Sequence, residues 1–312
     1  MGNAYEPATQ PTMYFIGVTT GSSSIMKVFP KWARELGLKD TVIKGIDFAP
    51  HSPAEDYRRA VEFLKNDPLS MGALVTTHKI DLYNAYRDQF DYLDPYALKL
   101  GEISSISKLD GKLRGHAKDP ISSGLALEHF VPENYWKDFG GDVMLMGAGG
   151  SSLAMSLYLT QEKFGENVPG RIILANRSQP RLDSAKELLG DLNPRTAIEY
   201  ILNPTPADND RTLASLKPHS LIVNATGLGK DGPGSPLTDA CSLPEDSLVW
   251  EINYRGDLLF KRQAEAQKEA RRLHVEDGWI YFIHGWTQVI SEVFHIDIKG
   301  ELLERLSEVA KS

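Results

Sequence analysis

The chain has 312 residues, of which 41% are hydrophobic and 24% charged, as is typical of a globular protein with room for two domains. The formal net charge of -8 argues against a nucleic-acid-binding protein, whose binding surface would be basic. There is no apolar run of 18 residues, no secretory signal pattern and only one cysteine, Cys241, so we expect a cytoplasmic protein with no disulfide framework, no cysteine metal site and no membrane partner.

The first part of the chain alternates predicted strands and helices. Asp110-Gly111 is a signal for a tight hairpin, and Asp119 follows the second hairpin strand. A connecting helix is predicted over 122–130. Before it, the apolar patterns predict strands over 14–18, 41–48, 73–76, 104–109 and 112–115, and helices over 25–36, 54–66 and 80–86.

The second part continues the alternation, which predicts a doubly wound parallel sheet that binds ligands at the carboxyl ends of its strands. From Gly278 onward the chain reads as helical, with a break near His295. Before that, we predict strands over 143–147, 172–175, 197–202, 220–225, 247–252 and 274–275, and helices over 151–164, 208–216 and 257–273.

A glycine-rich turn joins the first of these strands to its helix. Gly147 would permit a sharp turn, Gly149 a close approach of the backbone to phosphate, and Gly150 close packing of the helix. Such turns also occur in proteins that bind no nucleotide, so the residues at the end of the next strand are needed to indicate whether a nucleotide binds here and which one. It carries Arg177 and Arg181, which suit a 2′-phosphate and favour NADP over NAD, unless both arginines are simply solvated.

Several stretches in order along the chain resemble motifs of the shikimate dehydrogenase family. In the second part these are the nucleotide loop 147–154, the Asn-Arg-x-x-x-Arg signature at 176–181, the Asn-Ala-Thr-x-x-Gly stretch at 224–229, and 251–254, which is similar to the family's strand end with aspartate and tyrosine. In the first part, 75–79 lies where the family has Asn-Val-Thr-x-Pro-x-Lys, and 113–119 lies where it has Gly-x-Asn-Thr-Asp.

The resemblance implies a catalytic pair, Lys79 and Asp119. The chemistry is consistent with this, because reducing a ketone requires a proton on oxygen, which a lysine ammonium can donate while a neighbouring carboxylate orients it. The alternative is that both are ordinary surface charges. The implied cofactor-binding residues are Gly147, Ala148, Gly149, Gly150, Ser151, Asn176, Arg177, Ser178, Arg181, Ala225, Thr226 and Gly227, and no metal is expected.

The substrate-binding residues depart from the family pattern. By resemblance to the family's substrate-binding positions, Ser23, Ser104, Tyr254 and Gln288 are implied to contact the substrate. However, the family's polar residues are replaced at several places, by Ala73, Val75, Ser104, Ala117 and Gly285. Because a site built for hydrogen bonding discriminates strongly, we expect a substrate other than shikimate, such as a cyclitol-like or less polar ketone.

We therefore predict an α/β fold with an NADP-binding Rossmann domain over 124–285 and a smaller substrate-binding α/β domain over 1–123, completed by helices over 286–312. The expected function is an NADP-dependent oxidoreductase acting on a small molecule, as a monomer or homodimer. Two alternatives stay open: a divergent but authentic shikimate dehydrogenase, and a catalytically silent nucleotide-binding regulator. We expect His78, His116 and His284 to be polar cleft residues or surface histidines rather than metal ligands.

Overall fold

The computed structural model describes residues 5–190, 192–229 and 232–311. The chain divides into two compact units, which we call unit 1 (Met1–Lys118 with Gly285–Ser312) and unit 2 (Asp119–His284). The chain thus passes between the units twice, after Lys118 and after His284. The units are defined by how compact each part of the chain is. The predicted domain boundaries concern parts that fold independently, and they stay predictions.

Unit 1 contains a mixed sheet with the order β2-β1-β3-β5-β6-β4. The pairs β2–β1 and β1–β3 are parallel, whereas β5 is antiparallel to β3 and β6. It follows that β1, β3 and β6 run in one direction and that their carboxyl ends share one edge. The hairpin at Asp110-Gly111 is confirmed, with positive φ angles of 51° and 74° at its two turn residues. The strands are β1 (Thr12–Gly17), β2 (Val42–Asp47), β3 (Ser70–Val75), β4 (Tyr92–Leu93), β5 (Ser105–Leu109) and β6 (Lys112–His116).

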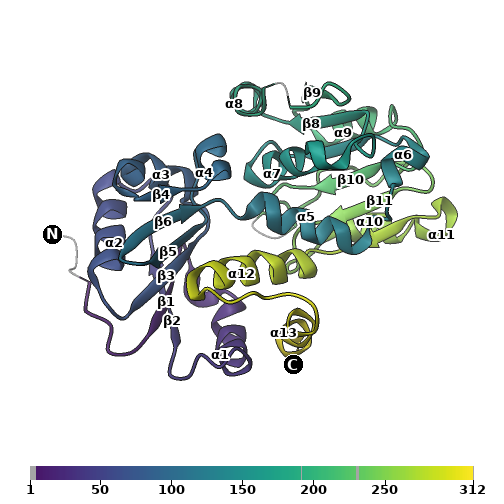
Figure 1. Ribbon diagram of the computed structural model, residues 1–312. Helices are drawn as coiled ribbons and strands as arrows, with labels where there is room; N and C mark the ends of the chain where they lie inside the picture. The colour runs from purple at the N-terminus through teal and green to yellow at the C-terminus, as the bar shows by residue number, and fades with distance from the viewer. Residues whose placement is uncertain (1–4, 191, 230–231, 312) are drawn as a thin grey trace. The chain divides into compact units, whose positions relative to one another are not determined.

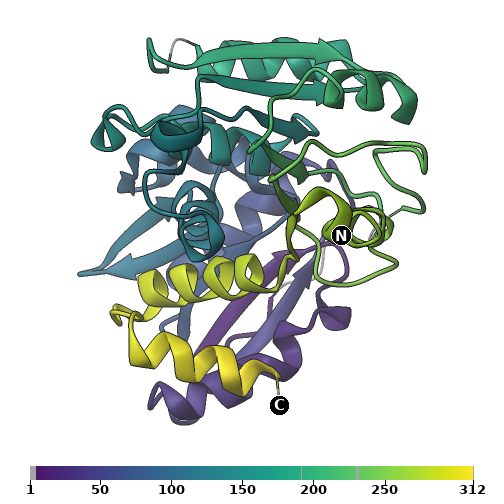
Figure 2. The ribbon, with the colours of Figure 1, turned by 90° about the vertical axis from the view of Figure 1, so that its right-hand side faces the viewer.

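Helices cover both faces of this sheet (Figure 1). On one face, α2 and α3 contribute buried side chains such as Tyr57 and Leu82 to a core shared with β1 and β3. On the other, Phe15 of β1 meets Trp286 of α12 edge to face at 4.9 Å. Figure 2 shows α13 lying alongside α1, where the Trp32 indole donates to the Leu306 carbonyl at 2.7 Å. The helices are α1 (Ile25–Glu35), α2 (Ala54–Asn66), α3 (Lys79–Tyr86), α4 (Pro95–Leu100), α12 (Trp279–Phe294, which begins in unit 2) and α13 (Glu301–Lys311).

Unit 2 contains a six-stranded sheet in which every neighbouring pair is parallel, with the order β12-β11-β10-β7-β8-β9. Counted within the unit, this is the strand order 3-2-1-4-5-6 of dinucleotide-binding folds, and the order reverses between β7 and β10. The predicted doubly wound sheet is therefore confirmed. Its strands are β7 (Val143–Met146), β8 (Arg171–Asn176), β9 (Ala197–Leu202), β10 (Leu221–Asn224), β11 (Leu248–Glu251) and β12 (His274–Glu276).

The helices over Tyr135–Phe139 and Gln179–Leu189 were not predicted, and two of the predicted helices of unit 2 have a different length. The helix predicted over 151–164 ends at Leu159, and Thr160 is its C-cap residue, with its hydroxyl bonded to the Ser156 carbonyl at 2.7 Å. The helix predicted over 257–273 is two short helices, and between them the Gln267 side chain accepts a hydrogen bond from the Leu243 amide at 3.1 Å. The helices are α5 (Asp119–Phe130), α6 (Tyr135–Phe139), α7 (Gly150–Leu159), α8 (Gln179–Leu189), α9 (Pro206–Leu213), α10 (Leu259–Glu265) and α11 (Lys268–Arg271).

Among the described residues, no helix has the length and apolar character needed to cross a bilayer. Likewise, no three or more His, Cys, Asp or Glu side chains are grouped in the described part of the chain so that they could hold a metal ion.

Buried histidines make the free energy of unfolding depend on pH. Burial lowers the pKa of His116 and of His284 from 6.5 to about 4 in each case, and Glu292 partly opposes the shift of His116. Since the unfolded chain binds these protons between pH 6.5 and about 4 and the folded chain does not, stability is lost as pH falls through this window. We expect denaturant titrations at pH 7.0, 5.5 and 4.5 to show a progressive loss, at most about 3 kcal/mol for each histidine.

A matched pair of variants tests the assignment. His116→Gln should reduce this pH dependence by about half, because His284 keeps its share, whereas His51→Gln should leave it unchanged, because the His51 side chain is 85% exposed. An unfolding free energy that stays constant across the window would contradict the prediction.

Candidate active site

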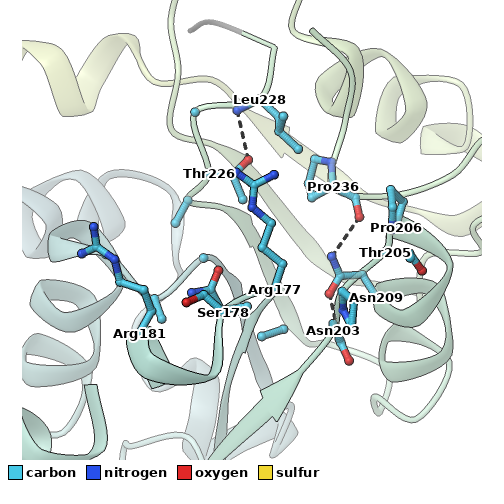
Figure 3. Close-up of a pocket in the computed structure, with 18 of the residues that line it drawn as sticks. Arg177, Ser178, Arg181, Asn203, Thr205, Pro206, Asn209, Thr226, Leu228 and Pro236 are labelled. Atoms are coloured by element: carbon cyan, nitrogen blue, oxygen red, sulfur yellow. Dashed lines mark hydrogen bonds between the residues drawn. The ribbon is translucent and has the colours of Figure 1, made fainter. Parts of the chain in front are cut away.

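A cavity of about 580 Å³ opens at the carboxyl edge of the unit 2 sheet, where the strand order reverses (Figure 3). This is the position at which open α/β sheets bind their ligands. The ends of four strands, β7 to β10, supply its walls. The lining residues are Gly147, Ala148, Gly149, Ala175, Asn176, Arg177, Ser178, Arg181, Asn203, Pro204, Thr205, Pro206, Asn209, Ala225, Thr226, Gly227, Leu228, Gly232 and Pro236.

The turn after β7 has a conformation that requires glycine at its first position. Gly147 has a φ of +113°, and a Cβ atom there would lie 2.6 Å from the Ala225 carbonyl oxygen. Gly149 faces open space and is the N-cap of α7, so the free amides of the first turn of α7 are available to an anion. Gly150 and Ser151 begin α7 and do not line the cavity, and the Ser151 hydroxyl accepts a hydrogen bond from Tyr281 at 3.4 Å.

Two exposed arginines border the cavity at the end of β8. Arg177 follows the strand, Ser178 is the N-cap of α8, and Arg181 lies in the first turn of that helix. In Figure 3, Arg177 extends toward the loop of Thr226 and Leu228, and Arg181 projects from α8. None of the described residues that line the cavity is Asp or Glu. The cavity is therefore positively charged and suits phosphate groups, which bind planar guanidinium groups well.

One wall of the cavity consists of residues that the sequence reasoning missed. Asn203 follows β9, and its amide donates to Asn209 at 2.8 Å and to Thr212 at 2.9 Å. Asn209 in turn donates to the Pro236 carbonyl at 2.9 Å, which ties this wall to a distant loop (Figure 3). The strand over 197–202 was predicted, so the carboxyl-end rule alone could have placed 203–206 at the ligand edge.

Lys79 lies at the shared carboxyl edge of the unit 1 sheet, as the first residue of α3. The residue before it, His78, is fully buried, with one ring nitrogen 3.0 Å from the Tyr57 hydroxyl and the other 3.1 Å from the Gly17 carbonyl oxygen. The prediction of a cleft or surface position for His78 was therefore wrong. Its two hydrogen bonds attach the start of α3 to α2 and to the end of β1, and so fix the backbone of Lys79.

Asp119 is the first residue of α5 and directly follows Lys118. The segment before it is fixed by three hydrogen bonds within unit 1. The Ala117 amide donates to Asp94 at 3.1 Å, and the Lys118 amide donates to the Ser104 hydroxyl at 2.7 Å. The Lys118 ammonium donates to Glu292 of α12 at 2.6 Å.

The predicted substrate contact Ser104 and the nearby His116 are both buried in this region of unit 1. Ser104 is 2% exposed, and its hydroxyl accepts the Lys118 amide and donates to the His116 carbonyl at 3.4 Å. This hydroxyl therefore holds the polypeptide segment before Asp119. His116 is 3% exposed, with one ring nitrogen 3.2 Å from Glu292, so the expected cleft or surface position was wrong for His116 too. His284 is also buried, at 8% exposure.

The remaining predicted substrate contacts are half-buried. Ser23 follows a short 3-10 turn after β1, and Gln288 lies on α12; both belong to unit 1 with Lys79. Tyr254 belongs to unit 2 with Asp119, and its ring packs against Phe282 at 4.6 Å and Trp279 at 5.9 Å.

The chain is similar to curated shikimate dehydrogenases. No protein-family model matches it. It is 29% identical to "Shikimate dehydrogenase (NADP(+))" of Lactococcus lactis over 167 residues, 53% of this chain and 54% of that protein. It is 25% identical to the protein of the same name from Streptococcus thermophilus over 238 residues, 75% of this chain and 76% of that protein. The chain thus spans about half the length of the first of these relatives and three quarters of the second.

Solved structures share the fold over nearly the whole chain. The shikimate dehydrogenase of Aquifex aeolicus aligns with a TM-score of 0.71 at 19% identity, covering 97% of this chain and 99% of that one. The 5-ketofructose reductase of Gluconobacter aligns with a TM-score of 0.68 at 17% identity, covering 97% and 98%. The fold and the glycine turn define a two-unit α/β protein with a dinucleotide-type sheet. The chain is thus similar to shikimate dehydrogenases in sequence over half to three quarters of its length, and in fold over nearly all of it.

Proposed function

We propose that the protein is an NADP(H)-dependent oxidoreductase that transfers a hydride between the nicotinamide and a ring ketone or alcohol other than shikimate. The observation that carries this proposal is the cavity at the β7–β10 switch point, which has a glycine turn, two arginines and no acidic residue among the described residues that line it. An acidic side chain at the end of the second strand would favour NAD, whereas arginine favours the 2′-phosphate of NADP.

The residues have separate roles. The free amides at the start of α7 would hold the pyrophosphate, while Arg177 and Arg181 would bind the 2′-phosphate with Ser178 beside them. When bound, NADPH supplies the hydride. Lys79 would donate the proton to the carbonyl oxygen and stabilise the developing negative charge on it. Asp119 would accept a hydrogen bond from the ammonium and orient it.

The unit 1 residues favour a substrate less polar than shikimate. The Ser104 hydroxyl is already bonded to backbone groups, and Ala73, Val75 and Ala117 are fully buried apolar residues where the resembling motifs have polar ones. Ser23, Gln288 and Tyr254 stay as proposed substrate contacts. A structure with the same fold is named a 5-ketofructose reductase, which supports a neutral polyhydroxylated ketone as one class to test.

A second candidate, an authentic shikimate dehydrogenase, is favoured by the names of the curated relatives. Steady-state assays with NADPH and NADH separate an enzyme for another ring ketone from an authentic shikimate dehydrogenase. The ketones are 3-dehydroshikimate, 3-dehydroquinate, a cyclitol ketone and 5-ketofructose, and shikimate is tested in the oxidative direction with NADP. We expect a neutral ketone to exceed 3-dehydroshikimate in kcat/KM by about 100-fold or more. Turnover of shikimate at an ordinary kcat/KM, above about 10⁴ M⁻¹s⁻¹, would establish the second candidate instead. Turnover of none of the substrates, with NADPH bound, would favour a silent nucleotide-binding regulator.

A further inference from the structure

A fully buried carboxylate lies beside the cofactor cavity without lining it. Glu251 ends β11, is 0% exposed, and pairs in register with Asn224 at the end of β10. One of its oxygens accepts the Asn224 side-chain amide at 2.7 Å. The other accepts the backbone amide of Asn253 at 2.9 Å and its side-chain amide at 2.6 Å. A buried acidic group with three donors directed at it is satisfied only as an acceptor.

This arrangement determines which way the Asn224 amide faces. An ionised carboxylate cannot donate, so Asn224 must present its NH₂ group to Glu251 and its oxygen to the opposite side. That oxygen accepts the Thr226 backbone amide at 3.1 Å and the Thr226 hydroxyl at 2.6 Å. The Thr226 hydroxyl oxygen accepts the Leu228 amide at 3.2 Å, the bond drawn in Figure 3. Glu251 therefore determines the orientation of the Asn224 amide, and the Asn224 oxygen in turn holds the loop 225–228 by hydrogen bonds.

The same loop forms one wall of the cavity and presses on the glycine turn. Ala225, Thr226, Gly227 and Leu228 all line the cavity, and the Ala225 carbonyl is the group that excludes a side chain at Gly147. A change in the course of this loop would therefore alter the space left for the nucleotide on two sides.

We propose that Glu251 is a positioning residue for the cofactor: it orients the Asn224 amide and through it fixes the loop 225–228 against the nucleotide. This rests on the proposed function, since it takes NADP(H) as the ligand. Substitution by glutamine preserves the shape but not the polarity. In Glu251→Gln the new NH₂ group faces another N–H donor, from either Asn224 or Asn253. If the Asn224 amide turned over to accept from it, the Asn224 NH₂ group would instead face the Thr226 backbone amide, which is also a donor.

The decisive variant exchanges the carboxylate at position 251 with the side-chain amide at position 224. In Glu251→Gln/Asn224→Asp, the glutamine NH₂ donates to the aspartate, the glutamine oxygen accepts from Asn253, and the aspartate still accepts both Thr226 donors. The total charge is unchanged. We expect the Kd for NADPH, measured by fluorescence titration, to rise about 10-fold in either single variant and to return to within about 3-fold of the wild-type value in the double variant.

Two further variants separate positioning from general destabilisation. Val249→Ala removes packing from the same strand and should lower the melting temperature without changing the Kd, because Val249 belongs to the core of unit 2. Thr226→Val removes the hydroxyl between Asn224 and Leu228 and should raise the Kd about 10-fold while leaving the three hydrogen bonds of Glu251 in place, so the proposal stays testable even if Glu251→Gln does not fold.

The outcomes are distinguishable. An unchanged Kd in folded Glu251→Gln, or a double variant that binds no better than the single ones, would overturn the positioning role while leaving the proposed function intact. Wild-type protein that does not bind NADPH would overturn the proposed function, and the role of Glu251 with it.

Discussion

Replacing Lys79 by methionine should lower kcat by about 100- to 10,000-fold and leave the Kd for NADPH unchanged. Methionine keeps the length and apolar stem of the side chain but cannot donate a proton or carry a charge. Since Lys79 is not among the described residues that line the cofactor cavity, nucleotide binding should not depend on it. The measurements are kcat with the best ketone from the substrate panel and a fluorescence titration with NADPH.

A matched control is Lys112→Met, which removes an exposed lysine at the start of β6 in the same unit. It should have the kcat of the wild type. Full activity in Lys79→Met would mean that the proton comes from another group and that the resemblance of 75–79 to the family motif has no catalytic meaning here. A parallel loss of NADPH affinity would point instead to a structural role for Lys79.

The fold was accessible from the sequence because its signals are local. The hairpin at Asp110-Gly111, the helix over Ala54–Asn66 and the strand over Ala197–Leu202 all follow from periodicity or turn chemistry within a few residues. The two errors in helix length lie at Thr160 and at Gln267, where the predicted periodicity continues but the helix ends. At Gln267 the side chain bonds to a loop 24 residues away in the sequence, a contact that periodicity does not report.

The candidate site was only partly accessible for the same reason. Motifs placed Gly147 and Arg177 at one cavity, because both follow strands at the same edge of a parallel sheet. The burial of His78 could not be read from its neighbours in the chain. Its partners, Tyr57 and Gly17, are 21 and 61 residues away and meet it only in the folded unit. The strain at Thr77, with a φ of 53° in a β-branched residue, is equally invisible in the sequence.

Glu251 shows a third reason why the site could not be predicted fully from the sequence. The sequence marks it as a strand-end acid by resemblance, but its effect depends on the register that sets it opposite Asn224. A shift of one residue between β10 and β11 would move its side chain to the other face of the sheet. Positioning residues of this kind become visible only when the hydrogen-bond donors and acceptors around them can be counted.

Arg177→Ala should raise the KM for NADPH by about 10- to 100-fold while changing the KM for NADH by less than about 3-fold. The reason is that the guanidinium stands at the end of β8, where an NADP-binding sheet meets the 2′-phosphate, and NADH lacks that group. The preference for NADPH over NADH would then fall by the same factor. Steady-state kinetics with both cofactors measure this ratio directly, and titration with adenosine 2′,5′-bisphosphate tests the phosphate contact without any substrate.

Arg195→Ala is the control, because Arg195 is an exposed arginine of unit 2 that does not line the cavity. The pattern of losses decides what Arg177 binds. Equal losses for NADPH and NADH would assign Arg177 to a phosphate that both cofactors carry, and the choice between the cofactors would then rest with Arg181 and Ser178. No loss with either cofactor would mean that the guanidinium is simply solvated at the end of the strand. A selective loss with NADPH is the result that the absence of acidic residues among the described cavity residues leads us to expect.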